Sequence, residues 1–345
     1  MHKAPVVLLL LLFSVFNTAC EKGLAHGDPN AVIVAAPGDW WPELRDSVFD
    51  ALSPDVFTLR DERTFRLQYE DPTGPDWGLK RMFKEVVVIG GPEEPRMAEA
   101  LGTLPDTVTV TVPGAFQTED VWARGQNVSL ILVDPQAPVA PQVFSLVGEV
   151  HTAMDERFRE GALRRMFVTG RNHALADSLQ KEAGFSLVLP QVYRWAFEDS
   201  LYIFRNDNPN PAELIRQFAV TWRTPILESM STEALMDWKE ALSEESYSSA
   251  QVVDRESLFT RNLSLGEMQV FEVRGAWLNP PEATWPAAGP FLVWTVACPS
   301  QDRLYLIDAW LYAPGKDKWE YILQIETILE SFRCGSAGPA TAVVG

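Results

Sequence analysis

Three apolar runs follow one another in the last third of the chain and lead into an amphipathic segment. They read EMQVFEVRGAW over residues 267–277, GPFLVWTVAC over 289–298 and RLYLIDAWLYAP over 303–314. Their length, alternation and intervening turn residues are typical of antiparallel strands. The segment 316–332 repeats apolar residues at helical spacing, through Trp319, Ile322, Leu323 and Leu329. The pattern predicts a C-terminal antiparallel meander closed by an amphipathic helix.

The first half of the chain mixes buried-strand patterns with helical ones. Runs with the length and β-branched content of buried strands occupy 31–36, 85–91 and 128–134. Alternating segments that also predict strands lie at 64–70 and 107–112, the second reading TVTVTV. Helical periodicity covers 42–52, 141–166 and 173–183. We expect an N-terminal α/β half with a mixed sheet, so that the whole chain belongs to the α+β class.

Between these two regions the patterns are less regular. Two more strands are expected from FSLVLP at 185–190 and DSLYIFRN at 199–206. Short helical or mixed segments are expected at 212–220 and 231–242, and the acidic, serine-rich stretch 243–251 reads as a loop.

The N-terminus has the layout of an export signal. Met1-His2-Lys3 precedes an apolar run from Ala4 to Phe16 that is shorter than the roughly 20 residues needed to span a bilayer, and small residues precede Cys20. This predicts a signal peptide over residues 1–19. Thr18-Ala19 before Cys20 resembles a bacterial lipobox, in which the cysteine is acylated. Asn17 stands where an aliphatic residue is usual, so simple secretion remains the alternative.

Acylation of Cys20 would anchor the protein to a membrane surface, with membrane lipid as its partner there. The polar residues 20–30 are expected to form a tether to the folded body. The expected organisation is then an N-terminal half over 31–170, a C-terminal half over 171–334 and a disordered tail over 335–345.

Charge excludes one class of partner. The chain has 47 acidic and 29 basic residues and a net charge of −18. Such a body would be repelled by nucleic acid, which we exclude as a partner. It would also be repelled by anionic lipid, so membrane attachment should depend on the acyl group.

Besides Cys20, the chain contains only Cys298 and Cys334. An even pair in an exported protein permits a disulfide, which here would tie the last helix to its sheet. Two buried free thiols are the alternative.

Signals for catalysis are weak throughout the sequence. No HExxH, CxxC or GxSxG motif occurs, so no catalytic residue, metal site or cofactor is predicted. His151 and Asp155 have the spacing of two metal ligands, but a buried structural histidine is the favoured interpretation. Close acid pairs would allow glycoside cleavage; the candidates are Glu119 with Asp120, and Glu272 with Asp308.

The stretch RGAWLNPPEATWPAAGPFLVW at 274–294 offers an arginine and aromatic side chains around a stiff proline-rich loop. A rigid loop of this kind at the end of a sheet suits an anionic or aromatic ligand. The candidate binding surface consists of Arg274, Trp277, Trp285 and Phe291. In the alternative, architectural interpretation, Arg274 pairs with a buried acid and Trp277 packs under the loop.

The motifs Glu272-x-Arg274-Gly275-x-Trp277, Gly289-Pro290-Phe291 and Trp310-Leu311-Tyr312-Ala313-Pro314 resemble the lipoprotein family filed as domain of unknown function 4837. Ala276 and Ala287-Ala288 depart from the usual pattern. The resemblance implies a lipoprotein of the cell envelope and no activity. We therefore expect a non-catalytic binding or assembly factor with an envelope protein or a glycan as partner. An envelope glycan hydrolase with an acid pair is the alternative.

Overall fold

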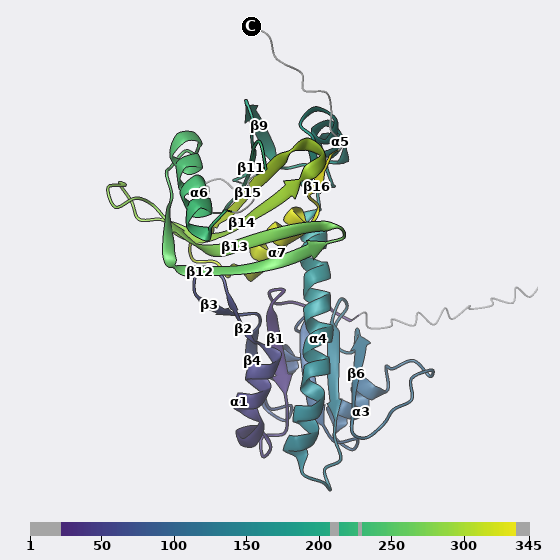
Figure 1. The fold of residues 1–345 in the computed structure, drawn as a ribbon. Coiled ribbons are helices and arrows are strands. Elements are labelled where there is room, and N and C mark those ends of the chain that lie inside the picture. The colour runs from purple at the N-terminus through teal and green to yellow at the C-terminus, as the bar shows by residue number, and fades with distance from the viewer. Residues whose placement is uncertain (1–21, 208–213, 227–229, 336–345) are drawn as a thin grey trace, which may run out of the picture. The chain divides into compact units, whose positions relative to one another are not determined.

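The computed structural model describes residues 22–207, 214–226 and 230–335 (Figure 1). The chain divides into two compact units: one contains the residues up to Asp46 with Leu67–Val150, and the other contains Ser47–Arg66 with the residues from His151 on. The predicted boundary at residue 170 therefore falls inside the second unit. The mixture of helices with mixed and antiparallel sheets confirms the α+β class.

The first unit is built on a five-stranded sheet with the order β4-β1-β5-β7-β6. β5 pairs in parallel with β1 and β7, and β6 pairs antiparallel with β7, so the predicted mixed sheet is confirmed. The strands are β1 Ala31–Ala35, β4 Arg66–Glu70, β5 Glu85–Gly90, β6 Gly114–Glu119 and β7 Asn127–Leu132. The helices are α2 Trp77–Lys80 and α3 Pro95–Leu101, with α1 Trp41–Leu52 and α4 Val139–Met166 each shared between the units.

One sequence prediction for the first unit is wrong, and the expected tether makes backbone contacts. The TVTVTV segment at 107–112 lies outside the strands, with Val108, Val110 and Val112 exposed, because strand propensity needs a paired neighbour and a buried face to take effect. The expected tether is hydrogen-bonded: the Ala25 amide donates to the Arg124 carbonyl at 2.9 Å and the Lys84 amide to the His26 carbonyl at 2.9 Å. Cys20 lies outside the described residues, as does the tail after Gly335.

The second unit carries a seven-stranded antiparallel sheet with the order β12-β13-β14-β15-β11-β10-β9. Consecutive pairing of β13, β14 and β15 confirms the predicted meander. The strands are β9 Arg194–Glu198, β10 Leu201–Asn206, β11 Ile215–Arg223, β12 Val252–Leu265, β13 Met268–Leu278, β14 Ala288–Cys298 and β15 Arg303–Tyr312. The helices are α5 His173–Glu182, α6 Thr232–Ser246 and α7 Trp319–Glu330, with a 3₁₀ turn at Pro299–Gln301. Short pairs are formed by β2 Asp55–Phe57 with β3 Asp61–Arg63, and by β8 Phe185–Ser186 with β16 Arg333–Cys334.

The regions with irregular patterns contain the other errors. Residues 215–223, expected in part as helical or mixed, form the interior strand β11, and β8 is much shorter than the run FSLVLP suggested. Helix α6 continues through part of the expected loop, to Ser246. β12 is absent from the sequence interpretation because a β-bulge between Asp254 and Phe259 interrupts its alternation and most of its side chains are partly or fully exposed.

The two faces of this sheet are each covered by a helix. Side chains alternate along a strand between the faces, so Trp294 of β14 packs with Ile325 of α7, whereas Val293 packs with Leu235 of α6. We call these the α7 face and the α6 face. A disulfide joins Cys298, at the end of β14, to Cys334 of β16, with the Cα atoms 5.9 Å apart.

None of the helices at 22–207, 214–226 and 230–335 has both the length and the apolar character that crossing a membrane requires.

Candidate functional site

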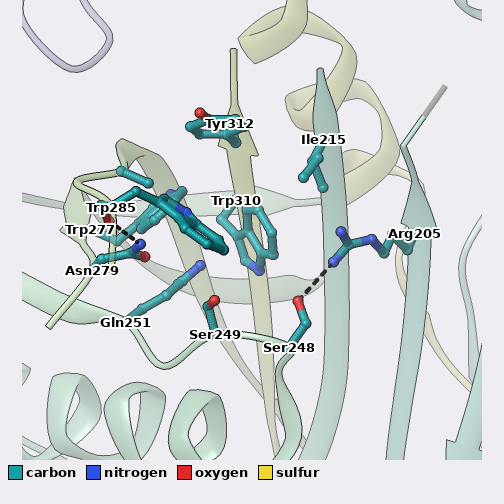
Figure 2. A pocket seen from close by; sticks show the side chains of 11 residues that line it. Arg205, Ile215, Ser248, Ser249, Gln251, Trp277, Asn279, Trp285, Trp310 and Tyr312 are labelled. Atoms are coloured by element: carbon teal, nitrogen blue, oxygen red, sulfur yellow. Dashed lines mark hydrogen bonds between the residues drawn. The ribbon is translucent and has the colours of Figure 1, made fainter. Parts of the chain in front are cut away.

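A cavity of about 340 Å³ opens on the α6 face of the seven-stranded sheet (Figure 2). Its volume lies at the lower end of the range usual for small-molecule sites. The walls come from β10, β11, β13 and β15, from the connection between α6 and β12, and from the loop between β13 and β14. The lining residues are Arg205, Ile215, Ser248, Ser249, Gln251, Trp277, Asn279, Trp285, Ala287, Trp310 and Tyr312.

The aromatic wall is fixed by the sheet. The ring of Trp277 lies 5.4 Å from that of Trp310 and 6.4 Å from that of Tyr312, both on β15. The Trp277 indole also donates a hydrogen bond to the Leu311 carbonyl at 3.2 Å. Gly289 makes this possible, since a Cβ atom there would collide with that carbonyl and with the indole. The glycine of the Gly289-Pro290-Phe291 motif thus lets the Trp277 indole approach the Leu311 carbonyl closely.

Trp285 closes the aromatic wall from the loop side. Its side chain is 63% exposed, and the loop that carries it is closed at its base by hydrogen bonds from Asn279. The Asn279 amide donates to the Ala287 carbonyl at 2.9 Å, and its Nδ2 to the Trp285 carbonyl at 3.0 Å. An exposed indole on a loop held in this way is positioned for a ligand rather than for the core.

Beneath the aromatic residues lies a buried polar cluster. Lys239 of α6 is fully buried; its Nζ donates to Oε1 of Gln251 at 2.7 Å and lies 3.3 Å from Oδ2 of Asp308. The Tyr247 hydroxyl donates to the same Oδ2 at 2.7 Å. Burial lowers the pKa of Lys239, although Asp308 acts in the opposite direction. Burial, together with the Asp308 carboxylate, raises the pKa of Tyr247 well above its ordinary value.

Some polar atoms around the cavity have no hydrogen-bond partner in the described part of the chain. Two such atoms, Trp310 Nε1 and Asp308 Oδ1, are buried. An unsatisfied buried polar group costs roughly 1–3 kcal/mol. Because both atoms are buried, they belong to the polar floor beneath the cavity and not to the surface that a ligand would touch.

Arg205 is the one charged residue among the described lining residues. Its Nη1 donates to Gln217 Oε1 at 3.2 Å and to Ser248 Oγ at 3.5 Å, and its Nε lies 3.5 Å from Asp207. The guanidinium carbon is 5.9 Å from the ring centre of Trp310. These contacts are long, and 29% of the side chain is exposed, so donors remain free to bind an anion.

The structure divides the predicted binding surface. Trp277 and Trp285 line the cavity, whereas Arg274 lies on the α7 face, because residues three apart on a strand point in opposite directions. Phe291 is fully buried and packs against Gly275, so it has no exposed surface to offer a ligand.

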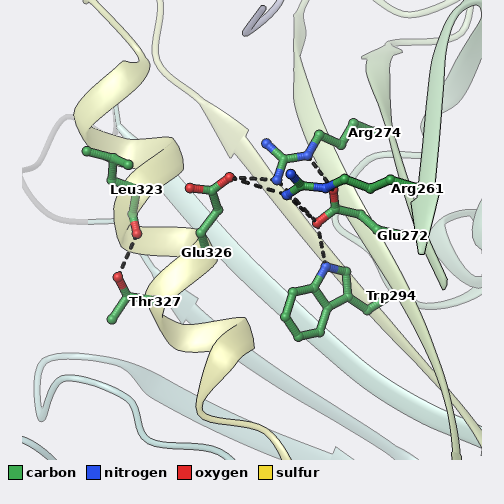
Figure 3. Close-up of polar contacts among 7 residues, drawn as sticks. All are labelled: Arg261, Glu272, Arg274, Trp294, Leu323, Glu326 and Thr327. Carbon is green, nitrogen blue, oxygen red and sulfur yellow. Dashed lines mark hydrogen bonds and ion pairs between the residues drawn. The ribbon is translucent and has the colours of Figure 1, made fainter. Parts of the chain in front are cut away.

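Arg274 instead belongs to an ion-paired cluster (Figure 3). It donates to Glu272 and, through Nη2, to Glu326 of α7 at 2.6 Å. Glu272 also accepts from Arg261 Nε at 2.6 Å and from Trp294 Nε1 at 2.7 Å. Burial of Glu272 raises its pKa, but the hydrogen bonds from Arg274 and Arg261 outweigh it, so the pKa is lowered overall. The cluster matches the architectural interpretation of Arg274.

Neither acid pair forms a pair of free carboxylates. β14 separates Glu272 from Asp308, and the two side chains lie on opposite faces of the sheet. In the first unit, Asp120 Oδ1 accepts from the amide of Gly125 at 2.6 Å and so stabilises a turn. Within the described residues, no group of three or more His, Cys, Asp or Glu side chains could hold a metal ion.

Sequence reasoning missed the polar residues of this site. Gln251 and Ser248 belong to a stretch interpreted as a loop, and Arg205 lies in a predicted strand whose pattern gives no sign of a site. Lys239 did have a signal: Leu235, Lys239 and Leu242 have the spacing of one helical face, and a lysine on an apolar face predicts a buried, paired charge.

The fold and the site define an α+β unit with an aromatic cavity on one face of an antiparallel sheet. Residues 172–331, the greater part of that unit, match the sequence model described as Domain of unknown function (DUF4837), as the motifs indicated. No curated protein matches the chain.

Three solved structures are distantly similar. The cyanobacterial PsbP protein CyanoP of Synechocystis sp. PCC 6803 is 10% identical, with a TM-score of 0.31 over 44% of this chain and 88% of that one. The Ran-binding protein Mog1p of Saccharomyces cerevisiae is 11% identical, with a TM-score of 0.30 over 44% of this chain and 91% of that one. LpqN of Mycobacterium tuberculosis, involved in cell envelope biogenesis, is 11% identical, with a TM-score of 0.27 over 42% of this chain and 79% of that one. Scores this low assign no role to the chain.

Proposed function

We propose that this chain is an exported, lipid-anchored protein of a bacterial cell envelope, and that it binds a ligand in the aromatic cavity without transforming it. The observation that carries the proposal is the cavity itself. Trp277, Trp310 and Tyr312 hold rigid rings on one side, Trp285 presents an exposed indole, and Gln251 and Arg205 add polar groups to the lining. These are the features of a preformed binding site.

The envelope location is supported by the N-terminal pattern. The charged start, the short apolar run and the small residues before Cys20 are those of an exported lipoprotein. The disulfide between Cys298 and Cys334 suits an oxidising compartment.

Glycan hydrolysis has less support. It requires two carboxylates about 5–9 Å apart on either side of the scissile bond, and the described lining contains no acidic residue. Asp308, which lies beneath the cavity, is fully buried and engaged by Lys239 and Tyr247. We therefore favour binding over catalysis.

Co-purification tests the binding role. The protein and its Trp285→Ala variant would be isolated from native envelopes under mild conditions, and bound small molecules and glycans identified by mass spectrometry. Because Trp285 is exposed, its loss should leave the fold intact and deplete the bound compound. Phe259→Ala is the matched control, since Phe259 is 56% exposed on β12 and does not line the cavity. Equal recovery from all three proteins, or conversion of the compound during incubation, would contradict the proposal.

A further inference from the structure

We infer that the ligand of the aromatic cavity is a carboxylate-bearing organic compound. Its carboxylate accepts a hydrogen bond from the side-chain amide of Gln251, and an apolar or CH-rich face of the same compound packs against the tryptophans. This inference rests on the proposed binding role of the cavity. It names the chemistry that the cavity recognises.

The first step concerns the orientation of the Gln251 side chain. Lys239 Nζ is 2.7 Å from Gln251 Oε1. An ammonium group donates and does not accept, so the amide oxygen must face Lys239. Exchanging oxygen and nitrogen would place two donors against each other. Lys239 is itself held by Asp308 and lies 4.9 Å from the ring centre of Phe291. The amide nitrogen of Gln251 is therefore directed away from the lysine, toward the cavity (Figure 2).

The second step concerns what this donor meets. Within the described residues, no hydrogen bond uses Gln251 Nε2: the side chain accepts from Lys239, and the backbone amide and carbonyl bond to Ser243. Trp310, only 5% exposed, has an indole N–H without an acceptor. That nitrogen is buried, whereas Figure 2 draws the Gln251 amide nitrogen and the Ser249 hydroxyl toward the same space. Gln251 Nε2 is thus a donor that lines the cavity and receives no acceptor from the described residues.

The third step is the balance of charge. The chain has 47 acidic and 29 basic residues, yet the described lining contains Arg205 and no acid. Asp207 lies 3.5 Å from Arg205 and Asp308 is paired with Lys239, so both nearby carboxylates already have cations. A neutral sugar offers hydroxyl donors that need acceptors in return, whereas a carboxylate only accepts. Gln251 Nε2 and the Arg205 guanidinium are groups that only donate, and they favour the carboxylate.

The fourth step concerns the rest of the ligand. The rings of Trp277 and Trp310 meet at 70° and the exposed Trp285 lies at the rim. Aromatic walls of this kind bury apolar or CH-rich surface. Two sources share this chemistry, a sugar acid unit of a glycan and an aromatic or aliphatic acid. The test separates them.

Matched probes test the inference on the purified full chain. They are phenylacetate with its neutral amide, and glucuronate with glucose, titrated by calorimetry and by saturation-transfer NMR. A charge-assisted hydrogen bond should make at least one acid bind about tenfold or more tightly than its neutral counterpart. Phenylacetate as the preferred acid would indicate an aromatic acid, and glucuronate a glycan.

Variants assign the effect to the donor. Gln251→Glu is nearly isosteric, preserves an acceptor for Lys239 and replaces the amide donor with negative charge. It should weaken acid binding about tenfold or more and leave the neutral probes unchanged. Trp310→Phe, which keeps an aromatic ring and removes only a buried N–H, should change acid binding little. Arg274→Lys, on the α7 face, should leave all affinities unchanged.

The outcomes separate the inference from the proposed function. If acid and neutral probes bind equally and Trp285→Ala weakens both, the cavity binds ligands but the carboxylate inference fails. If neither acid binds, or if Gln251→Glu leaves acid binding unchanged, the inference fails as well. If the probes bind but Trp285→Ala changes the affinity of none of them, both the carboxylate inference and the proposed binding function of the cavity fail.

Discussion

Two buried carboxylates lie on opposite faces of the seven-stranded sheet, and each has its own cations. Glu272 on the α7 face meets Arg261 and Arg274, and Asp308 on the α6 face meets Lys239. Burying an ion is tolerated only with a partner in good geometry. The first cluster joins β12, β13 and α7, whereas the second holds the floor of the cavity. At the scale of residues, one cluster stabilises the unit and the other also orients Gln251.

Replacing Glu272 should destabilise the protein strongly. In a Glu272→Gln variant, Arg261 and Arg274 lose their shared carboxylate and the Trp294 indole keeps only an amide acceptor. Breaking a buried pair costs about 3 kcal/mol or more of unfolding free energy. Urea denaturation would measure the loss. Glu326→Gln is the control and should cost less, since Glu326 is more exposed than Glu272 and makes one close contact with Arg274 and a longer one with Arg261. An equal cost for both would contradict the central role of Glu272.

The same carboxylate should make stability depend on pH. Its pKa in the folded protein is lower than in the unfolded chain, where it is about 4.3, because the hydrogen bonds from the arginines outweigh burial. The stabilisation is therefore fully present above the unfolded value and is lost as pH falls through the folded value. Urea titrations from about pH 6 to about pH 3 should show the wild type losing its advantage over Glu272→Gln. If the stability difference between the wild type and Glu272→Gln stays constant with pH, this prediction is wrong.

Lys239 should be indispensable to the α6 face. Lys239→Met leaves Asp308 buried without its cation and should cost about 3–5 kcal/mol of unfolding free energy. Adding Asp308→Asn removes the stranded charge, so the double variant should be more stable than the single one. Denaturant unfolding of both variants is the measurement. Lys181→Met, at an exposed position of α5, should change stability by no more than about 0.5 kcal/mol. If the double variant is the less stable, the charge argument is wrong.

At the scale of elements, the sequence predicted the parts whose pattern repeats without interruption. β13, β14, β15 and α7 combine clear periodicity with short connections, and all of them are found. β12 was missed because a strand with exposed side chains and a bulge has no period to detect. β11 is interior and buried through Phe218–Val220, which sequence alone cannot distinguish from a short buried helix.

The candidate site shows the same limit. Trp277 and Trp285 could be selected because Gly and Pro mark a loop between two strands. That Arg274 faces the other way follows from strand parity, and could have been predicted. Gln251 and Arg205 could not, since they come from segments far apart in the sequence that meet only when the sheet is assembled.

The disulfide should stabilise the corner where the last elements meet. It closes a separation of 36 residues, for which the chain-entropy argument gives about 3–4 kcal/mol. Gln301 Nε2 also bridges the carbonyls of Gly184 and Gly335 at 2.6 and 2.8 Å there. Urea unfolding of the wild type before and after reduction would measure the difference, with a linked Cys298–Cys334 peptide as the covalent control. Two free thiols in an oxidised preparation would refute the bond.

At the scale of the whole molecule, membrane attachment should depend on one residue. Cys20 lies outside the described residues, and the body that follows is strongly acidic, with 47 acids against 29 bases in the chain. Such a body has no electrostatic attraction to anionic lipid, so nothing replaces a lost acyl group. The Cys20→Ala variant should therefore move from the membrane fraction to the soluble or secreted fraction.

Fractionation with metabolic labelling by a fatty acid would follow this change. The wild type should carry label and require detergent for release, and Cys20→Ala should carry none. Asn17→Leu is the matched control: it supplies the aliphatic residue that a lipobox usually has, and should leave labelling equal or stronger. If Cys20→Ala still partitions with membranes, the folded surface or a partner holds the protein there. If the wild type carries no label, the N-terminus directs simple secretion, and the cavity would then act on ligands free of the membrane.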